Sequence, residues 1–272
     1  QNDVTLLTTG QASGGGIVNI VNGVGVLPIS DTKSEIITLS LSDTFVSGLN
    51  ITSTQDLYFA VGVPNKFTII QPANGTVDGP ISVRVEAQDA GGNLITNYQN
   101  NVTLNANGSA TGDGLVEIMN RFGTLPISNT VVGIVALTLT DTELTGLNIS
   151  STKNVEFKHG IVAKFILMNP VDGTTDNPIP IEVKAYDQFN NLATTSQSDV
   201  TLVTTGSAAG AGVVDVVNGI GTLNISDTVA ETVGLTLTNG GSGVDVTSAQ
   251  DVVFGPGTPA RFDIVDPTDT NV

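Results

Sequence analysis

The sequence repeats itself at a fixed period. The stretch 22–32 (NGVGVLPISDT) returns as 120–130 (NRFGTLPISNT) and again as 218–228 (NGIGTLNISDT). The offsets, 120 − 22 and 218 − 120, are both 98 residues. A fixed period is typical of a chain that uses one structural module several times, so any fold for these 272 residues must be built from copies of one unit.

Each copy has the alternation of β-strands with one buried face. Ile81, Val83, Val85 and Ala87 alternate with polar or charged residues, and turn-forming residues separate such runs. Trp is absent and Phe numbers only 9, so the core must consist mainly of Val, Ile and Leu, which suit pleated sheets. About seven short strands in each repeat predict an all-β chain of tandem immunoglobulin-like antiparallel β-sandwiches, arranged end to end.

The repeat also predicts the domain boundaries. Residues 1–62 form an incomplete Ig-like module that lacks its first two strands, and 63–160 and 161–255 form complete modules. Residues 256–272 are the first strand of a further module or a donor strand. The linkers between these parts are short, which favours a stiff rod over a flexible string.

Two further features recur in register. Six of the nine Phe are expected to be core positions: Phe59, Phe157 and Phe254, and Phe67, Phe165 and Phe262. A turn of sequence Asp89-x-x-Gly92-Asn93 returns at 187–191 with Asn190 in place of the glycine. Asn tolerates positive φ better than most residues, so we expect the second turn to keep the same shape.

Together these residues carry a resemblance to a known family. The sequence resembles the bacterial Ig-like repeats of invasin- and intimin-type surface proteins in Phe67…Pro72, Asp89-x-x-Gly92-Asn93, Val102-Thr103-Leu104 and Val155-Glu156-Phe157. The resemblance covers the whole chain, although the glycine-rich segment 108–114 fits no named subfamily. It implies an extracellular or cell-surface protein that serves as a stalk, adhesin or filament.

The charge balance excludes several partners. The net charge is −17, from 26 acidic and 9 basic residues, and such a field repels phosphate backbones and anionic lipids. No stretch of eighteen apolar residues is present, so membrane insertion is not expected. Without cysteine the chain forms no disulfide.

Several acidic residues recur at the repeat period, and their pattern distinguishes metal ligands from hydrogen-bond acceptors. Asp3, Asp31 and Asp56 become Asn in the second repeat and Asp again in the third, which suits a hydrogen-bond acceptor better than a ligand. Asp89 and Asp187 do not alternate, and they are weak calcium candidates although their spacing is not that of an EF-hand. No other cofactor is expected.

No catalytic constellation is apparent. His159 is the single histidine, and it falls in a linker without a repeated partner, so we expect no enzyme. The favoured function is structural, the rod of a filament, stalk or surface fibre. The alternative is an adhesin whose loops at the sandwich ends bind a host protein or a glycan, although the chain has no Trp to stack on sugars.

The two ends of the chain suggest self-association. Phe262 and Ile264 align with the first strand of a module, while Val4 and Leu6 belong to the module without its first two strands. We therefore expect head-to-tail association in which the tail of one chain adds a strand to the next. The competing interpretation is a segment of a longer repeat array.

Overall fold

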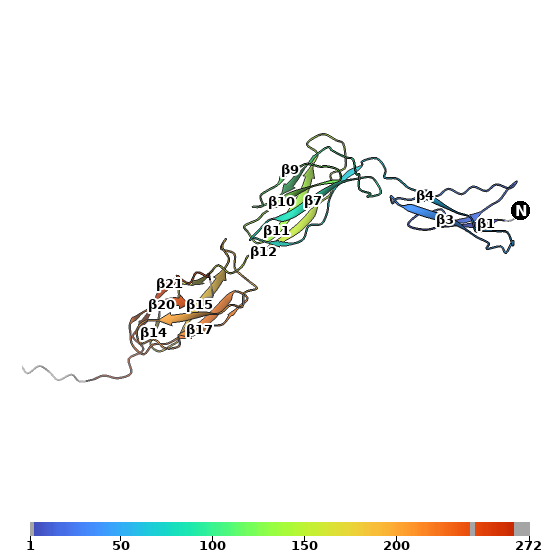
Figure 1. Cartoon of the computed structure of the whole chain (residues 1–272). Helices are drawn as coiled ribbons and strands as arrows, with labels where there is room; N and C mark the ends of the chain where they lie inside the picture. The colour runs from blue at the N-terminus through green and yellow to red at the C-terminus, as the bar shows by residue number, and fades with distance from the viewer. Residues whose placement is uncertain (1–2, 240–242, 264–272) are drawn as a thin grey trace, which may run out of the picture. The chain divides into compact units, whose positions relative to one another are not determined.

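The computed structural model describes residues 3–239 and 243–263, which form strands, turns and loops without any helix (Figure 1). The predicted all-β class is therefore confirmed, and no helix of these ranges could span a membrane. The chain divides into two compact units. Unit 1 comprises residues 1–75, 79–129 and 133–157, and unit 2 comprises 76–78, 130–132 and 158–272.

Unit 1 begins with a single four-stranded antiparallel sheet, here the first sheet. Its strand order is β2-β1-β3-β4, from β1 (Val4–Thr8), β2 (Gly16–Val18), β3 (Ile36–Ser42) and β4 (Thr54–Tyr58). In the described part of the chain no second sheet lies on its inner face. Ile37 and Val18 are its only residues in the buried core.

The rest of unit 1 is a two-layer sandwich, here the first sandwich. One layer has the order β10-β7-β5, from β5 (Lys66–Ile69), β7 (Ile81–Gln88) and β10 (Phe122–Ile127). The other has the order β6-β12-β11-β8-β9, from β6 (Gly75–Thr76), β8 (Val102–Ala106), β9 (Gly114–Val116), β11 (Gly133–Thr140) and β12 (Lys153–Lys158). The sequence led us to expect about seven strands, and the additional one, β6, is too short to show an alternating pattern.

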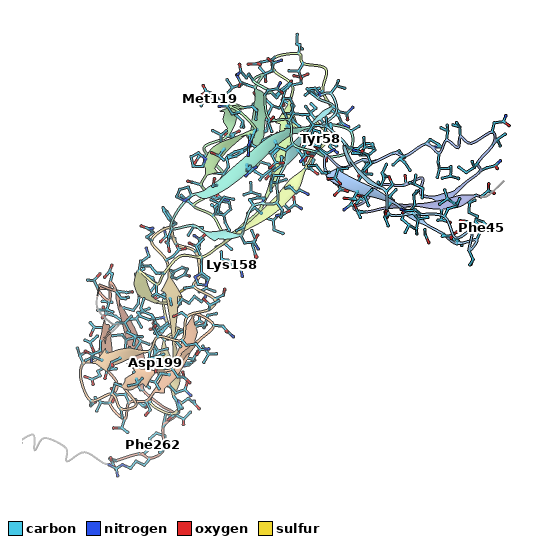
Figure 2. All side chains as sticks on the ribbon, turned by 45° about the vertical axis from the view of Figure 1, so that its right-hand side comes forward. Phe45, Tyr58, Met119, Lys158, Asp199 and Phe262 are labelled. Atoms are coloured by element: carbon cyan, nitrogen blue, oxygen red, sulfur yellow. The ribbon has the colours of Figure 1, made fainter. Side chains whose placement is uncertain are left out.

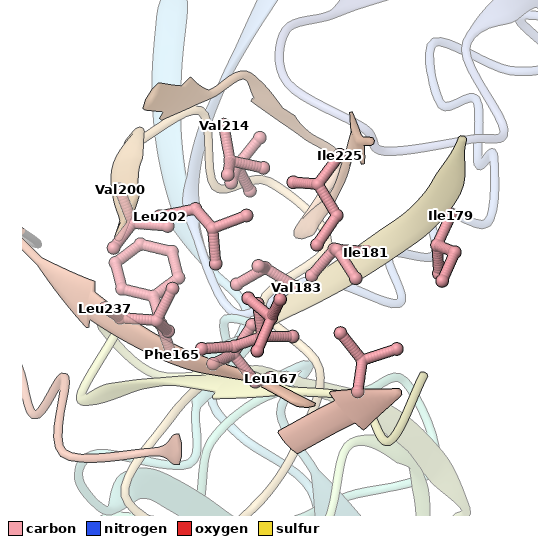
Figure 3. Packing of buried hydrophobic residues seen from close by; sticks show 14 of the residues in the cluster. Phe165, Leu167, Ile179, Ile181, Val183, Val200, Leu202, Val214, Ile225 and Leu237 are labelled. Atoms are coloured by element: carbon pink, nitrogen blue, oxygen red, sulfur yellow. The ribbon is translucent and has the colours of Figure 1, made fainter. Parts of the chain in front are cut away.

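Unit 2 repeats this architecture in the second sandwich. One layer, β13-β15-β19-β18, comprises β13 (Lys164–Leu167), β15 (Ile179–Tyr186), β18 (Val216–Val217) and β19 (Ile220–Ile225). The other, β14-β21-β20-β16-β17, comprises β14 (Gly173–Thr174), β16 (Val200–Thr204), β17 (Gly212–Val214), β20 (Thr232–Thr238) and β21 (Ala249–Gly255). Figure 3 shows Ile181 and Val183 of β15 packed with Leu202 and Leu237 of the other layer.

The predicted aromatic core positions are only partly correct. Phe67, Phe157, Phe165 and Phe254 are at most 1% exposed, as expected for core residues. Phe59 is only half-buried, because no layer formed by residues 3–239 and 243–263 covers the first sheet. Phe262 is fully exposed and follows the last strand rather than entering a core (Figure 2).

The turn that changes glycine to asparagine keeps its shape. Asn190 has φ of 69°, close to the 80° of Gly92, so both lie in the left-handed region. The backbone N–H of Asp187 donates to the carbonyl of Asn191 at 3.0 Å, as that of Asp89 does to Asn93 at 3.0 Å. The expectation that Asn190 preserves this turn is confirmed.

Candidate functional site: a repeated aspartate–asparagine clamp

The turn after β7 places two side chains at the end of the first sandwich. Beyond the backbone bond already described, Asp89 Oδ1 accepts the backbone N–H of Asn93 at 2.8 Å. The side-chain amide of Asn93 also donates to the Asp89 carboxylate, at 2.9 Å to Oδ2. One five-residue turn therefore fixes a carboxylate and an amide side by side.

The Asp89 carboxylate also holds the linker. Its Oδ2 accepts the backbone N–H of Gly62 at 2.8 Å, and the residue is only 5% exposed. Burial raises the pKa of Asp89, but the hydrogen bonds donated by Asn93, Gly62 and Gly91 oppose it and hold the pKa below the ordinary aspartate value. The carboxylate is therefore ionised at neutral pH and makes charge-assisted bonds.

The Asn93 amide reaches the loop that precedes β3. Its Nδ2 donates to the carbonyl of Thr32 at 2.8 Å, and its Oδ1 accepts the backbone N–H of Ser34 at 3.0 Å. An amide side chain that bonds a carbonyl and an N–H two residues apart fixes that backbone in two directions. We term this set of Asp89, Asn93, Gly62, Thr32 and Ser34 the clamp.

The same bonds recur in unit 2, and each member lies 98 residues further along the chain. Asp187 Oδ2 accepts the N–H of Gly160 at 2.9 Å, and Asn191 Nδ2 donates to the Asp187 Oδ2 at 2.9 Å. Asn191 Nδ2 also donates to the carbonyl of Thr130 at 3.0 Å, and its Oδ1 accepts the N–H of Val132 at 3.3 Å. Burial also raises the pKa of Asp187, yet the hydrogen bonds led by that of Gly160 hold it below the ordinary value.

A second carboxylate holds the linker residue after the glycine. Asp78 Oδ2 accepts the N–H of Ile161 at 2.8 Å, next to the Gly160 N–H that Asp187 accepts. The contact recurs at the end of the second sandwich, where Asp176 Oδ2 accepts the N–H of Thr258 at 2.7 Å. Two successive backbone N–H groups at 160–161 are thus fixed by carboxylates.

The surroundings of Asp89 and Asp187 are unfavourable for calcium. Their oxygens face N–H groups, whose positive ends repel a cation and leave few lone pairs for it. In residues 3–239 and 243–263 no three His, Asp or Glu side chains are grouped to hold a metal ion. The two aspartates act as acceptors for the turn and the linker.

The alternating Asp and Asn residues are also acceptors. Asp3 accepts the backbone N–H of Ile20 at 3.0 Å, Asn101 that of Ile118 at 3.0 Å, and Asp199 that of Val216 at 3.1 Å. An amide oxygen and a carboxylate oxygen make the same bond at this position, so the structural interpretation of the alternation is confirmed here.

His159 lies beside the second clamp. Its Nδ1 is 2.7 Å from the carbonyl oxygen of Gly160, and its Nε2 accepts the N–H of Thr195 at 3.1 Å. The first contact then requires a protonated Nδ1. This histidine bridges the linker and a loop of the second sandwich.

The residues predicted for strand addition are less buried than their equivalents in the first sandwich or lie in solvent. Val4 and Leu6 lie in β1 and are half-buried, whereas Val102 and Leu104 at the equivalent positions of β8 are fully buried. Phe262 projects into solvent, and Ile264 lies outside the described residues.

Sequence analysis found the aspartate but missed what the asparagine contacts. The motif predicts a turn residue at Asn93, whereas the structure shows that its amide also binds the backbone at 32–34, about sixty residues earlier in the sequence. The signal available was the joint recurrence of Asp-x-x-x-Asn and of Thr32 and Thr130 at the same period. Periodicity alone does not reveal which repeated residues touch one another.

Several solved structures are similar to this chain, whereas no family model and no curated protein matches it. Invasin, a bacterial integrin-binding protein, is 13% identical at a TM-score of 0.43, over 94% of this chain and 53% of its own. The Escherichia coli adhesin FdeC is 15% identical at a TM-score of 0.38, over 92% of this chain and 86% of the FdeC chain. InvD of Yersinia pseudotuberculosis is 19% identical at a TM-score of 0.44, over 73% of this chain and 61% of the InvD chain. Intimin domains match as well. The chain spans about half the length of the invasin structure, and the matches include both protein types of the sequence resemblance.

Proposed function

We propose that this chain is a structural part of an extracellular or cell-surface stalk or fibre, built from Ig-like modules with the boundaries 1–62, 63–160, 161–255 and 256–272. The observation that carries the proposal is the clamp, which recurs with the same donors and acceptors 98 residues apart. A stalk transmits force along its length, and it needs joints that keep successive modules from rotating freely. No metal ion or catalytic step enters this function.

The clamp suits that task because it uses backbone acceptors and donors. Asn93 bonds the main chain at Thr32 and Ser34, so the contact tolerates changes of side chain in the loop that it holds. The buried Asp89 holds the linker at Gly62 with a charge-assisted bond. Removal of the amide leaves an ionised carboxylate short of a donor, which typically costs about 1–3 kcal/mol or more.

The test measures whether the clamp in unit 1 holds the first sheet and the first sandwich at a fixed distance. The chain has no cysteine, so Gln55→Cys in β4 and Thr124→Cys in β10 place one spin label on each side of the clamp, at exposed positions. Pulsed electron–electron resonance should give a narrow distance distribution for the otherwise unchanged chain. Asn93→Ala should broaden it, whereas Asn97→Ala, at an exposed asparagine of the same loop, should leave it unchanged.

An equally narrow distribution for Asn93→Ala would contradict the proposed role of the clamp. Circular dichroism of the same variant should stay that of a β-protein, so that loss of the joint is separated from loss of the fold.

We also propose head-to-tail self-association by strand addition, with Phe262 and Ile264 of one chain near Val4 and Leu6 of another. The specific observation is the open inner face of the first sheet, together with the full exposure of Phe262. Burying one large apolar side chain gains about 1.5–3 kcal/mol. Sedimentation velocity should show oligomers for the full chain and monomers after deletion of 262–272, and an unchanged distribution would contradict this assembly.

A further inference from the structure

Three segments of the second sandwich meet beside a buried carboxylate. Asp227 follows β19 and is only 3% exposed. Ser207 lies in the loop after β16, and Glu231 comes directly before β20. Two backbone hydrogen bonds between Ala209 and Ser226, of 2.8 and 2.9 Å, hold the loops of Ser207 and Asp227 together. The fold therefore fixes two carboxylates and one hydroxyl group at one place.

The Ser207 hydroxyl contacts both carboxylates but has only one hydrogen. Its Oγ lies 2.8 Å from Asp227 Oδ1 and 2.8 Å from Glu231 Oε1. Because a hydroxyl donates a single hydrogen, only one of these two oxygens can accept it at a time. The other contact then joins two oxygen atoms with no hydrogen between them. A further positive charge, a proton or a cation, would relieve that contact.

The second oxygen of Asp227 has no donor at all. Oδ1 accepts the backbone N–H of Val229 at 2.9 Å, but Oδ2 is buried and accepts no hydrogen bond from the described residues. Hydrogen bonds, led by that of Val229, hold the pKa of Asp227 below the ordinary aspartate value, so the carboxylate is ionised at neutral pH. In the described part of the chain neither Asp227 nor Glu231 forms an ion pair with Lys or Arg. A buried polar atom without a partner typically marks the place of a water or an ion.

The first repeat has the same arrangement at the equivalent positions. Asp31 Oδ1 accepts the backbone N–H of Lys33 at 2.7 Å, and Asp31 Oδ2 is again buried without a partner among the described residues. Glu35 Oε1 accepts the N–H of Gln11 at 2.6 Å, as the glutamate of the second sandwich accepts its equivalent at 2.7 Å. The oxygen without a donor is therefore a property of the Asp–Glu pair rather than of one loop.

The middle repeat lacks both carboxylates. Asn129 stands at the place of Asp227, and Gly133 at the place of Glu231. Asn129 Oδ1 still accepts the hydroxyl hydrogen of Ser109 at 2.8 Å, so the hydrogen-bonding role of this position needs no charge. The change from Asp to Asn alone suits an acceptor, but the joint loss of the glutamate suits a task that the two carboxylates share.

We propose that Asp227 and Glu231 bind one calcium ion, with the Ser207 hydroxyl as a further ligand and water at the remaining positions. Calcium takes carboxylate and other oxygen ligands in a flexible geometry. Its charge supplies a partner for Asp227 Oδ2 and removes the repulsion between the two carboxylates. Ser207 is exposed, so its side chain can turn a lone pair to the ion and its hydrogen to solvent.

The number of ligands limits the affinity of the site. Calcium takes six to eight oxygens, and within residues 3–239 and 243–263 no third acidic side chain joins the pair. We therefore expect a dissociation constant of about 10⁻⁴–10⁻³ M, the range of extracellular modules. The pair of Asp31 and Glu35 should bind more weakly, because Lys33 lines the same cavity as Asp31 and stands where the second sandwich has Val229.

The experiment follows the amide signals of the ¹⁵N-labelled full chain by NMR as calcium chloride is added at pH 7 and constant ionic strength. The signals of Ser207 and Val229 should shift saturably, because both N–H groups donate to the carboxylates of the site. Those of Ser109 and Val131, their equivalents in the middle repeat, should not shift. Magnesium needs a smaller, nearly octahedral shell, so its dissociation constant should be about tenfold higher or more.

Two variants remove one charge each while keeping the hydrogen-bond acceptors. Asp227→Asn copies the middle repeat, where Asn129 keeps its bond to serine. Glu231→Gln retains an oxygen for the N–H of Ser207. Each should raise the dissociation constant for calcium at least about tenfold, since two carboxylates become one. The control Asp215→Asn removes the same charge at an exposed aspartate of the second sandwich and should leave the constant unchanged.

Four results would overturn the proposal. They are no saturable shift at Ser207 and Val229 up to about 10 mM calcium, equal affinity for Asp227→Asn, and an equal loss for Asp215→Asn, which would indicate only a diffuse acidic field. The fourth is a change of both signals between pH 7 and 5 that calcium does not alter, which would assign the pair a shared proton. None of these residues belongs to the clamp, so this test and that of the stalk function can fail independently.

Discussion

At the residue scale, the clamp aspartates combine burial with full hydrogen bonding. Burial alone would favour the neutral acid, but three or more N–H donors favour the charged form, and the pKa values of Asp89 and Asp187 lie below the ordinary value. This balance between burial and hydrogen bonding decides how the clamp aspartates respond to acid. It also explains why Asp is kept at both positions while other aspartates alternate with Asn.

The lowered pKa values predict a loss of stability in acid. Because the folded carboxylates bind protons less readily than the unfolded ones, their contribution is fully present above the unfolded pKa of about 4 and is lost as the pH falls through the lower folded value. We expect the free energy of unfolding to be nearly constant from about pH 8 to 5 and to decline below about pH 4. Asp187→Asn should be less stable at neutral pH and show a smaller decline.

Other carboxylates contribute to the same decline, so the variant must be compared with the parent chain. The pKa values of Asp43, Asp141, Asp227 and Asp245 are also lowered. The informative quantity is the difference between the two unfolding curves from pH 7 to pH 3. A difference that does not change with pH would contradict the assignment of a lowered pKa to Asp187.

At the element scale, the value of a core residue depends on the layer opposite it. Phe157 in β12 and Phe59 after β4 hold the same repeat position, but Phe157 is fully buried and Phe59 is only half-buried. The local sequence around the two phenylalanines is similar, so comparing them measures what the second layer contributes to burial. The same comparison applies to Val4 and Val102.

Phenylalanine truncation should therefore have unequal effects. Phe157→Ala should lower the stability of the first sandwich by about 3–5 kcal/mol through lost burial and a residual cavity. Phe59→Ala should cost about 1.5 kcal/mol or less, since its ring remains partly in water. Differential scanning calorimetry of the two variants and the parent measures both, and equal shifts would show that the first sheet is covered in solution.

The longer strands could be predicted from the sequence because alternation and turn residues act locally, whereas the two-residue β6 is too short to show alternation. Ile81, Val83 and Val85 identify β7, and Asn190 predicts a turn that the structure confirms. Pairing across long separations could not be predicted in this way. The contact of Asn93 with 32–34, and the half-burial of Phe59, depend on which segments meet, and a repeat gives the same local signal whether or not its partner layer is present.

At the scale of the whole molecule, the repeat occurs in two structural forms. Within the residues that the structure describes, two copies are two-layer sandwiches with buried cores, and one is a single sheet with an open face. Most of the stability of a domain comes from burial between layers, so local opening should be easiest where a layer is missing.

Hydrogen exchange at a matched leucine tests this difference. Leu6, Leu104 and Leu202 have equivalent ladder partners, Gly16 and Leu41 for the first, Gly114 and Leu139 for the second, Gly212 and Leu237 for the third. Leu6 is half-buried and the other two are at most 1% exposed. Because the backbone bonds are alike, only the opposing layer separates them, and we expect the amide of Leu6 to exchange at least about a hundredfold faster than the others. Similar protection at all three would mean that ladder bonds alone hold the first sheet, or that another molecule already covers its face.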